Sequence, residues 1–215
     1  LHRQGQDAVA LDGLGTRPGF SPDPPKEGFD VIPMWIADMN FPVLPAIQEA
    51  ILRRVQHPAF GYFDPSGAYY DAIVGWQQTR NGVTGVISAL NVFCSRGDQV
   101  LVHSPTYIGF TRSLQNNGYH IVHSPLVRDE KGIWRMDPAD MERKLVENNI
   151  HAAVFCSPHN PTGRVWERWE VEMAMELFRK HDVMVVSDEI WSDIIRPGCK
   201  HLPLQSISED ARNRT

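Results

Sequence analysis

The sequence predicts an α/β protein built around a mainly parallel β-sheet. Short, wholly apolar runs alternate with longer segments in which apolar residues recur at helical spacing, and glycine and proline fall between them. Such alternation is typical of βαβ units, whose strands are buried between two layers of helices. The chain has 215 residues, of which 42% are hydrophobic, and this is enough to bury one good-sized core.

The front of the chain does not follow this alternation. Residues 1–30 are rich in Gly, Pro and Asp, and the run Pro22–Pro25 cannot enter a helix or a central strand, so we expect an extended arm. We place a domain boundary between residues 44 and 45, where helical spacing begins. Three helices are then expected: one carrying Ile47, Ala50, Ile51 and Val55, one opened by Pro65 and carrying Tyr69, Ile73 and Trp76, and one at about 85–94.

The βαβ alternation itself begins after residue 98. Strands are expected at 100–102, 119–122, 152–156 and 183–186, and helices at 106–116, 138–148 and 167–181. Because each of these helices separates two short apolar strands, the strands can lie parallel in one sheet.

Composition excludes several classes of protein. The formal net charge is −5 and no Lys/Arg cluster occurs, which argues against a nucleic-acid partner. No apolar run approaches the roughly 18 residues that span a bilayer, so we expect no membrane partner. The three cysteines form no CxxC pair, which favours a reducing, cytoplasmic location over a disulfide framework or a zinc site. No GxGxxG motif follows a strand, so a Rossmann-type dehydrogenase is disfavoured.

Side chains that suit a ligand follow three of the expected strands. In an open α/β sheet, ligands bind beyond the carboxyl ends of the strands. Asp188, Asn160 and Tyr107 each come shortly after such an end. Taken singly, each has a plain structural alternative, as a helix cap, an Asn-Pro turn or a surface tyrosine. Together they predict one site at one edge of the sheet.

Four motifs, in order along the chain, resemble those of fold-type I enzymes that depend on pyridoxal 5′-phosphate (PLP), the aminotransferase class I/II superfamily. Two are general to such enzymes, Asn160–Gly163 (NPTG) and Ser187–Ile190 (SDEI). Two are more specific: Trp35–Pro42 (WIADMNFP) resembles the WxADMDFP segment, and Phe60–Tyr62 the FGY motif, of the MalY/PatB-type cystathionine and cysteine-S-conjugate β-lyases. The sequence is therefore similar to that β-lyase branch.

This resemblance implies a three-layer PLP-transferase-like large domain with a mainly parallel sheet over residues 45–215, preceded by an N-terminal arm of the small domain at 1–44. It also implies PLP as cofactor, a small-molecule amino-acid substrate and a homodimer. The family's Schiff-base lysine lies in a Ser-x-x-Lys-like segment beyond the last residue, so we expect this sequence to lack it and the C-terminal small domain. The lysines that are present do not match that segment: Lys26, Lys131, Lys144, Lys180 and Lys200.

The resemblance assigns roles to individual residues as well. Asp188 would pair with the pyridine nitrogen of PLP and keep the ring an electron sink, Asn160 would donate to the ring's O3′, and Tyr107 would stack on the ring. The remaining assignments are Tyr62 at the phosphate of the neighbouring subunit's cofactor, Val83 and Thr84 in a phosphate loop at 82–85, Ala37 and Asp38 near the substrate, and Trp191 beside the cofactor.

Two of these assignments rest on segments that depart from the family pattern. Residues 77–81 run directly into the phosphate loop, where the family has a longer stretch that includes a strand. Trp191 stands where this branch often has histidine. An indole N–H can donate a hydrogen bond but cannot accept one or titrate, so acid–base help is not expected from this position.

The leading interpretation is a PLP-dependent C–S β-lyase that converts cystathionine or an L-cysteine-S-conjugate to pyruvate, ammonia and a thiol. A PLP-dependent aminotransferase is the nearest alternative, because the cofactor residues are shared and only the WIADMNFP and FGY segments favour the lyase. A non-catalytic truncated product is a third interpretation, which the missing lysine favours.

Overall fold

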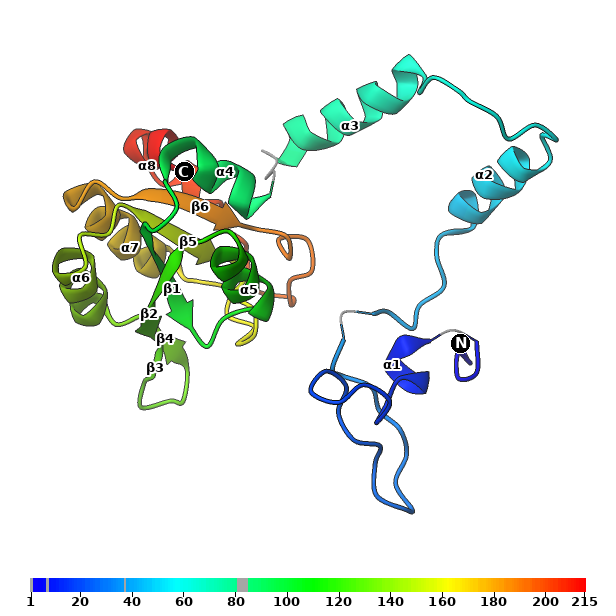
Figure 1. Ribbon diagram of the computed structural model, residues 1–215, viewed down its shortest axis with the longest axis horizontal. Helices are drawn as coiled ribbons and strands as arrows, with labels where there is room; N and C mark the ends of the chain where they lie inside the picture. Colours follow the sequence, from blue (N-terminus) through cyan, green and yellow to red (C-terminus); the bar gives the residue numbers. More distant parts are fainter. Residues whose placement is uncertain (1, 7, 37, 81–84) are drawn as a thin grey trace. The chain divides into compact units, whose positions relative to one another are not determined.

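The computed structural model describes residues 2–6, 8–36, 38–80 and 85–215, with the backbone alone for residues 76–80. The chain divides into two compact units, Leu1–Pro65 and Ser66–Thr215 (Figure 1). The sheet belongs to the second unit. The assignment of residues 1–44 to an arm and 45–215 to a large domain stays a prediction, because it concerns the domains of the family rather than contacts within this chain.

The first unit holds α1 (Val9–Asp12) and α2 (Pro45–Val55), joined by turns and by chain without regular secondary structure. Trp35 ties this connecting chain back to α1, because its indole N–H donates to the carbonyl oxygen of Ala10 at 2.9 Å. Its ring also packs edge-on against Phe20, with ring centres 5.5 Å apart. The WIADMNFP segment is therefore anchored within its own unit.

The apolar face predicted for α2 is present but not buried within its unit. Ile47, Ile51 and Val55 are 48%, 57% and 58% exposed. Helical spacing of apolar residues shows that one face of a helix is hydrophobic, but it does not say what covers that face.

Four parallel strands form the sheet of the second unit, in the order β2-β1-β5-β6. Their bounds are His120–Pro125 for β2, Gln99–Ser104 for β1, Ala152–Cys156 for β5 and Met184–Asp188 for β6. Val100 pairs with Ile121 on one side and with Ala152 on the other, and Ala152 pairs in turn with Met184. Every residue of β5 is buried, as a strand between two neighbours and two helical layers requires.

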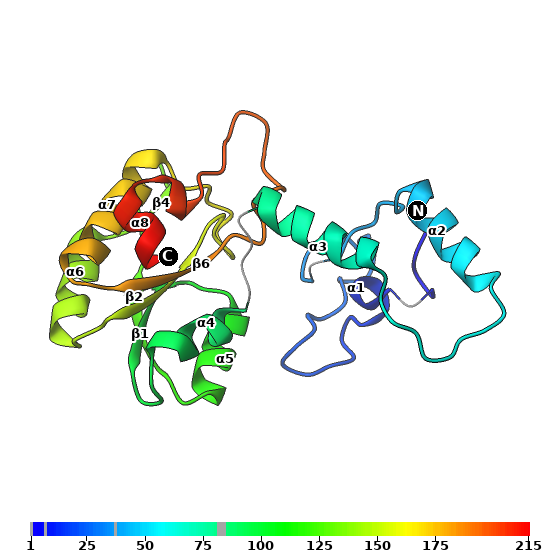
Figure 2. The same ribbon diagram turned by 90° about the horizontal axis from the view of Figure 1, so that it is seen from above.

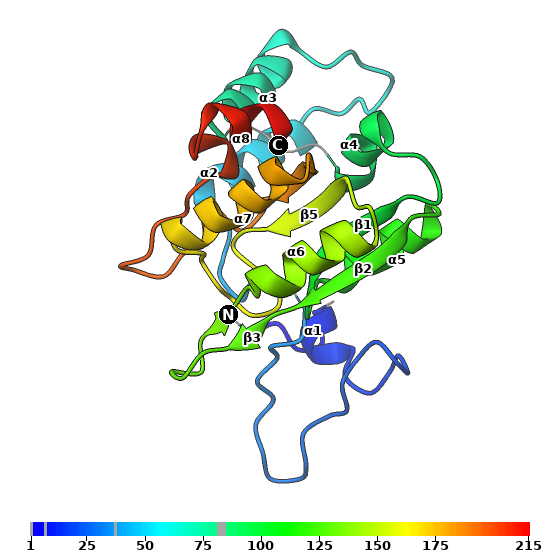
Figure 3. The same cartoon turned by 90° about the vertical axis from the view of Figure 1, so that its left-hand side faces the viewer.

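Helices cover both faces of this sheet, and the direction of the chain decides which face each one takes. α5 (Ile108–Asn116) carries the chain from β1 outward to β2, whereas α6 (Pro138–Glu147) and α7 (Arg168–Lys180) carry it the other way, to β5 and β6. Crossovers between parallel strands are right-handed, so opposite directions place helices on opposite faces. Figure 2 shows α6 and α7 on one face and α5 with α4 (Val86–Phe93) on the other, and Figure 3 has the α6–α7 face toward the viewer.

Each face of the sheet has its own hydrophobic core. On the α6–α7 side, Met141, Phe155 and Phe178 are almost completely buried. On the α4–α5 side, Leu90 and Leu114 are completely buried against the inner strands. Each large apolar side chain buried in this way contributes about 1.5–3 kcal/mol, so both helical layers are held by their packing on the sheet.

The fold class predicted from the sequence is confirmed, because the expected strands and crossover helices are present in the expected order. α3 (Gly67–Arg80) corresponds to the helix expected after Pro65. Sequence reasoning missed the short elements: α1, the antiparallel pair β3 (Val127–Arg128) and β4 (Trp134–Arg135), the 3-10 turn η1 (Leu204–Ser206) and α8 (Glu209–Arg214). Over the described ranges, no helix has the length and apolar character needed to cross a membrane.

Candidate functional site

The crossover connections of the sheet run in opposite directions on the two sides of the boundary between β1 and β5. α5 leaves β1 toward one face and α7 leaves β5 toward the other, and the carboxyl ends of strands at such a reversal are where ligands bind in open α/β sheets. Val102 pairs with Val154, and Cys156 pairs with Asp188, so the ends of β1, β5 and β6 lie side by side at one edge. This edge carries the three loops that the sequence singled out.

Asp188 is the last residue of β6 and is only half-buried. Its Oδ1 accepts a hydrogen bond from the backbone N–H of Ile190 at 3.0 Å. Burial raises the pKa of the Asp188 carboxyl and the charge of Glu189 adds to the rise, while the hydrogen bond from Ile190 opposes it. Among the described residues, no cationic side chain contributes to holding this carboxylate in its charged form. It therefore suits a ligand that brings a positive charge.

Glu189 fixes the chain next to Asp188. Its Oε1 accepts hydrogen bonds from the hydroxyl of Ser187 at 2.9 Å and from the backbone N–H of Leu204 at 3.1 Å. Its Oε2 lies 2.8 Å from Nε2 of His201. The end of β6 is thus tied to the chain that follows it, which holds Asp188 in place. Sequence reasoning treated Glu189 only as part of the SDEI motif and missed this role.

Asn160 lies half-buried in the turn that follows β5. The turn is closed by the N–H of Gly163, which donates to the carbonyl oxygen of His159 at 2.7 Å. His159 is buried, and its Nδ1 lies 2.8 Å from the hydroxyl of Thr162. Burial lowers the pKa of His159 to about 4, so its ring is neutral and acts as a structural support. The Asn160 amide therefore lies on a turn that is held in shape by the Gly163–His159 hydrogen bond and by the contact of His159 with Thr162.

Tyr107 directly precedes α5 and is 48% exposed. Its ring packs edge-on against Phe110, with ring centres 5.5 Å apart. A Cβ atom at Gly109 would lie 2.2 Å from the Cε1 atom of this ring, closer than any real contact. The ring can lie over the first turn of α5 only because residue 109 is glycine. Sequence reasoning did not single out Gly109.

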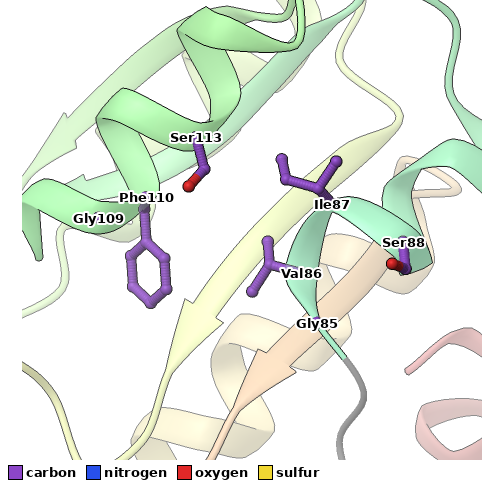
Figure 4. A pocket seen from close by; sticks show the side chains of 7 residues that line it. All are labelled: Gly85, Val86, Ile87, Ser88, Gly109, Phe110 and Ser113. Carbon is purple, nitrogen blue, oxygen red and sulfur yellow. The ribbon is translucent and has the colours of Figure 1, made fainter.

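A cavity of about 300 Å³ opens between α4 and α5 (Figure 4). It is lined by Gly85, Val86, Ile87 and Ser88 from the start of α4 and by Gly109, Phe110 and Ser113 from α5. Free N–H groups and the positive end of the helix dipole favour an anion at the start of a helix. Val83 and Thr84, expected in a phosphate loop, lie outside the described residues. They directly precede the part of α4 that lines the cavity.

The other residues singled out from the sequence fall in different places. Trp191 is half-buried in the turn after β6, at the same edge as Asp188. Asp38 belongs to the first unit, where its Oδ2 accepts a hydrogen bond from Arg3 at 2.8 Å. Tyr62 belongs to that unit too and is fully exposed. Ala37 lies outside the described residues.

Comparison with known proteins places this arrangement in a family. Residues 74–212 match the family model described as aminotransferase class I and II. The chain belongs to the aminotransferase class I and II family. The matched range contains the whole sheet and the Tyr107, Asn160 and Asp188 loops. The superfamily resemblance inferred from the four motifs is confirmed.

Relatives of this chain within the family include β-lyases. The chain is 40% identical to cystathionine beta-lyase PatB of Bacillus subtilis (strain 168), over 97% of this chain and 55% of that protein. It is 29% identical to protein MalY of Escherichia coli (strain K12), over 83% of this chain and 50% of that protein. The structure of cystalysin from Treponema denticola, which contains a PLP cofactor, matches with a TM-score of 0.79 and 28% identity, over 100% of this chain and 56% of that one. The chain thus spans about half the length of the curated relatives it matches.

Proposed function

We propose that this chain forms part of a PLP-dependent C–S β-lyase that acts on cystathionine or L-cysteine-S-conjugates and releases pyruvate, ammonia and a thiol. The observation that carries the proposal is Asp188, a partly desolvated carboxylate at the carboxyl edge of the sheet, on the strand next to the reversal between β1 and β5. The similarity to cystathionine beta-lyase PatB supports the choice of reaction.

The side chains at this edge fit the chemistry of PLP. A protonated ring nitrogen would give Asp188 the positive charge that favours its ionised form. Asn160 offers an amide donor on a braced turn, and Tyr107 offers a flat apolar surface for an aromatic ring. The cavity at the start of α4 suits a phosphate group, because two hydroxyls line it and a helix begins there.

When bound, PLP supplies a ring that draws electrons away from a carbanion at the substrate's α-carbon. In the proposed roles, Asp188 holds a proton at the ring nitrogen, because a nearby carboxylate favours the charged form of a base. Asn160 orients the ring through its amide, and Tyr107 keeps water from one ring face. Trp191 lies beside the cofactor, where its indole N–H can donate a hydrogen bond, and Asp38 contacts the substrate. The roles of Ala37, Val83 and Thr84 stay predictions from the family resemblance.

A homodimer is part of the same proposal, with Tyr62 reaching the phosphate of the second subunit's cofactor. The complete exposure of Tyr62 supports this role, because a buried side chain could not reach another subunit. The exposed apolar residues of α2 support it too, because large exposed apolar patches commonly mark protein interfaces. All three cysteines are free, which supports a reducing, cytoplasmic location.

The reaction is tested on the full-length enzyme of which this chain would form part, by supplying it with PLP and L-cystathionine and measuring pyruvate. Pyruvate released without any 2-oxo acid acceptor is the result expected of a β-lyase. Amino transfer that requires a 2-oxo acid would instead identify an aminotransferase. A full-length protein that binds PLP and catalyses neither reaction would contradict the proposal.

The role of Asp188 is tested separately, by titrating PLP against the protein and its Asp188→Asn variant. Loss of a hydrogen bond to a charged group costs about 1.5–3 kcal/mol, so the variant should bind PLP at least about tenfold more weakly. Asp182→Asn is the matched control, because the Asp182 side chain is 98% exposed. Equal affinity of all three proteins would remove Asp188 from the cofactor site.

A further inference from the structure

Three potential metal ligands meet at the amino edge of the sheet, opposite to the edge that carries Asp188. The Sγ of Cys94, a carboxylate oxygen of Asp98 and a ring nitrogen of His151 all lie within 4.8 Å of one another. The Nε2 of His151 is 3.3 Å from the Oδ2 of Asp98. Their sequence spacing matches no zinc motif, which is why sequence reasoning disfavoured a zinc site; the fold brings them together.

Backbone hydrogen bonds fix the positions of this cluster. Cys94 directly follows α4, while Asp98 directly precedes β1 and His151 directly precedes β5, which are neighbours in the sheet. The carbonyl oxygen of Asp98 accepts a hydrogen bond from the N–H of His120 at 2.9 Å. The carbonyl oxygen of His151 accepts one from the N–H of Met184 at 2.8 Å. The main chain that carries Asp98 and His151 is therefore held in place before any ion arrives.

The carboxylate of Asp98 is oriented as metal-ligating carboxylates commonly are. Its Oδ2 accepts a hydrogen bond from the backbone N–H of Ser95 at 2.7 Å. A carboxylate oxygen has two lone pairs, so this bond leaves capacity for a cation. The His151 side chain is 46% exposed, so an ion can reach the cluster and a water molecule can bind beside it.

The donor set selects a class of cation. Thiolate, imidazole and carboxylate are the ligands of Zn²⁺, whereas Mg²⁺ and Ca²⁺ prefer oxygen alone. The cluster also lies at the C-terminal end of α4, where unpaired carbonyl groups and the negative end of the helix dipole favour a positive charge.

We propose that Cys94, Asp98 and His151 bind one Zn²⁺, with a water molecule as the fourth ligand. Binding replaces the proton of the Cys94 thiol by the metal and releases that proton to solvent. The ion then links the end of α4 to the starts of β1 and β5. Because α4 begins at the cavity proposed for the phosphate, this link also steadies one wall of that cavity.

The site is tested by titrating the PLP-free protein with Co²⁺, which replaces Zn²⁺ and absorbs visible light. We expect one equivalent to bind, with the intense d–d bands of a four-coordinate ion and a thiolate-to-metal charge-transfer band. Zn²⁺ should abolish both signals by competition. In Cys94→Ser the charge-transfer band should be lost, and in His151→Gln the affinity should fall at least tenfold.

Two controls separate this site from incidental binding. Cys199→Ser removes an exposed thiol and His120→Gln an exposed imidazole, and both should leave the titration unchanged. His151→Gln alters a half-exposed side chain and keeps the test valid if Cys94→Ser does not fold. Absence of a thiolate band, survival of the band in Cys94→Ser, or unchanged affinity in His151→Gln would overturn the proposal.

Discussion

The backbone N–H of Ser157 donates to the carbonyl oxygen of Asp188 at 2.9 Å, so the pairing of β5 with β6 continues one residue past the end of β5. The main chain of Asp188 is held by this bond, and its side chain is left to face the ligand edge. A substitution of the Asp188 side chain should therefore change the charge at the site without releasing the strand. This separation makes Asp188 a good position for testing stability and ligand binding independently.

We expect Asp188→Asn to raise the stability of the PLP-free protein at neutral pH. Burial raises the pKa of Asp188, so the folded state disfavours its charged form. This penalty is absent below the ordinary pKa of aspartate, appears as the pH rises through the raised pKa, and persists above it. Urea unfolding at several pH values should show that the free energy of unfolding of the variant increases relative to that of the wild type as the pH rises through this window.

The converse result would be equally informative. If Asp188→Asn is less stable than the wild type at neutral pH, the carboxylate has a stabilising partner and is not poised for a cationic ligand. Asp182→Asn is again the control, because it removes the same charge from a side chain that is almost fully exposed. An equal gain in stability for this variant would show that the effect is not specific to Asp188.

Gly109→Ala should weaken PLP binding while leaving the fold intact. The new methyl group would lie 2.2 Å from the ring of Tyr107 and would force the ring away from its position over α5. Alanine is otherwise better than glycine in a helix by about 1 kcal/mol, so stability should not fall. Loss of one ring contact worth about 0.5–1.5 kcal/mol corresponds to an affinity loss of about twofold to tenfold.

Tyr107 variants show whether the Gly109 effect acts through the ring. Tyr107→Ala should lower PLP affinity about as much as Gly109→Ala, and Tyr107→Phe should keep it, because the phenyl ring can still stack. If Gly109→Ala and Tyr107→Ala weaken binding additively, the two residues act separately and the stacking role is wrong.

The sequence alone was enough to predict the sheet and the loops that carry the site. The run Ala152–Cys156 was predicted with the bounds that the structure has, because a fully apolar strand can be buried only between two helical layers. The order of crossovers then places Asn160 and Asp188 at one edge, whatever the details of packing. Such features depend on local pattern and chain direction, which the sequence displays.

Features that depend on contacts between distant segments could not be predicted in this way. The cluster of Cys94, Asp98 and His151 has no sequence signature, because it exists only when β1 lies beside β5. The close approach of the Tyr107 ring to Gly109 depends on one rotamer. β3 and β4 were missed because each is two residues long, too short to show a period.

Glu170→Gln should destabilise the second unit by about 3 kcal/mol. Glu170 is 1% exposed and pairs with Arg164, and its Oε1 lies 3.1 Å from Nη1 of Arg135. Its Oε2 also accepts a hydrogen bond from the N–H of Glu167 at 2.9 Å at the start of α7. Breaking a buried ion pair leaves charge uncompensated in a poorly solvated place, which costs a few kcal/mol. Chemical unfolding in urea measures the change.

A matched control for this prediction lies two residues further along α7. Glu172 pairs with Arg168 at 3.3 Å, but the two side chains are 49% and 60% exposed. Exposed pairs contribute about 0–1 kcal/mol, so Glu172→Gln should change stability by less than about 0.5 kcal/mol. Equal effects of the two substitutions would show that burial of Glu170 does not matter.

The three cysteines should differ sharply in their reactivity toward a thiol reagent at pH 8. Burial and the charge of Asp98 raise the pKa of Cys94 to about 11, and burial raises that of Cys156 to about 12. Only the thiolate reacts, so at this pH about one part in 10³ of Cys94 and about one part in 10⁴ of Cys156 is reactive. Cys199 is exposed and should react first.

With a chelator present, we therefore expect one fast thiol in the native protein and three after denaturation, and Cys199→Ser should abolish the fast phase. A fast phase that survives in Cys199→Ser would show that Cys94 or Cys156 is open to solvent, and the packing of α4 on the sheet would then be looser than the structure has it.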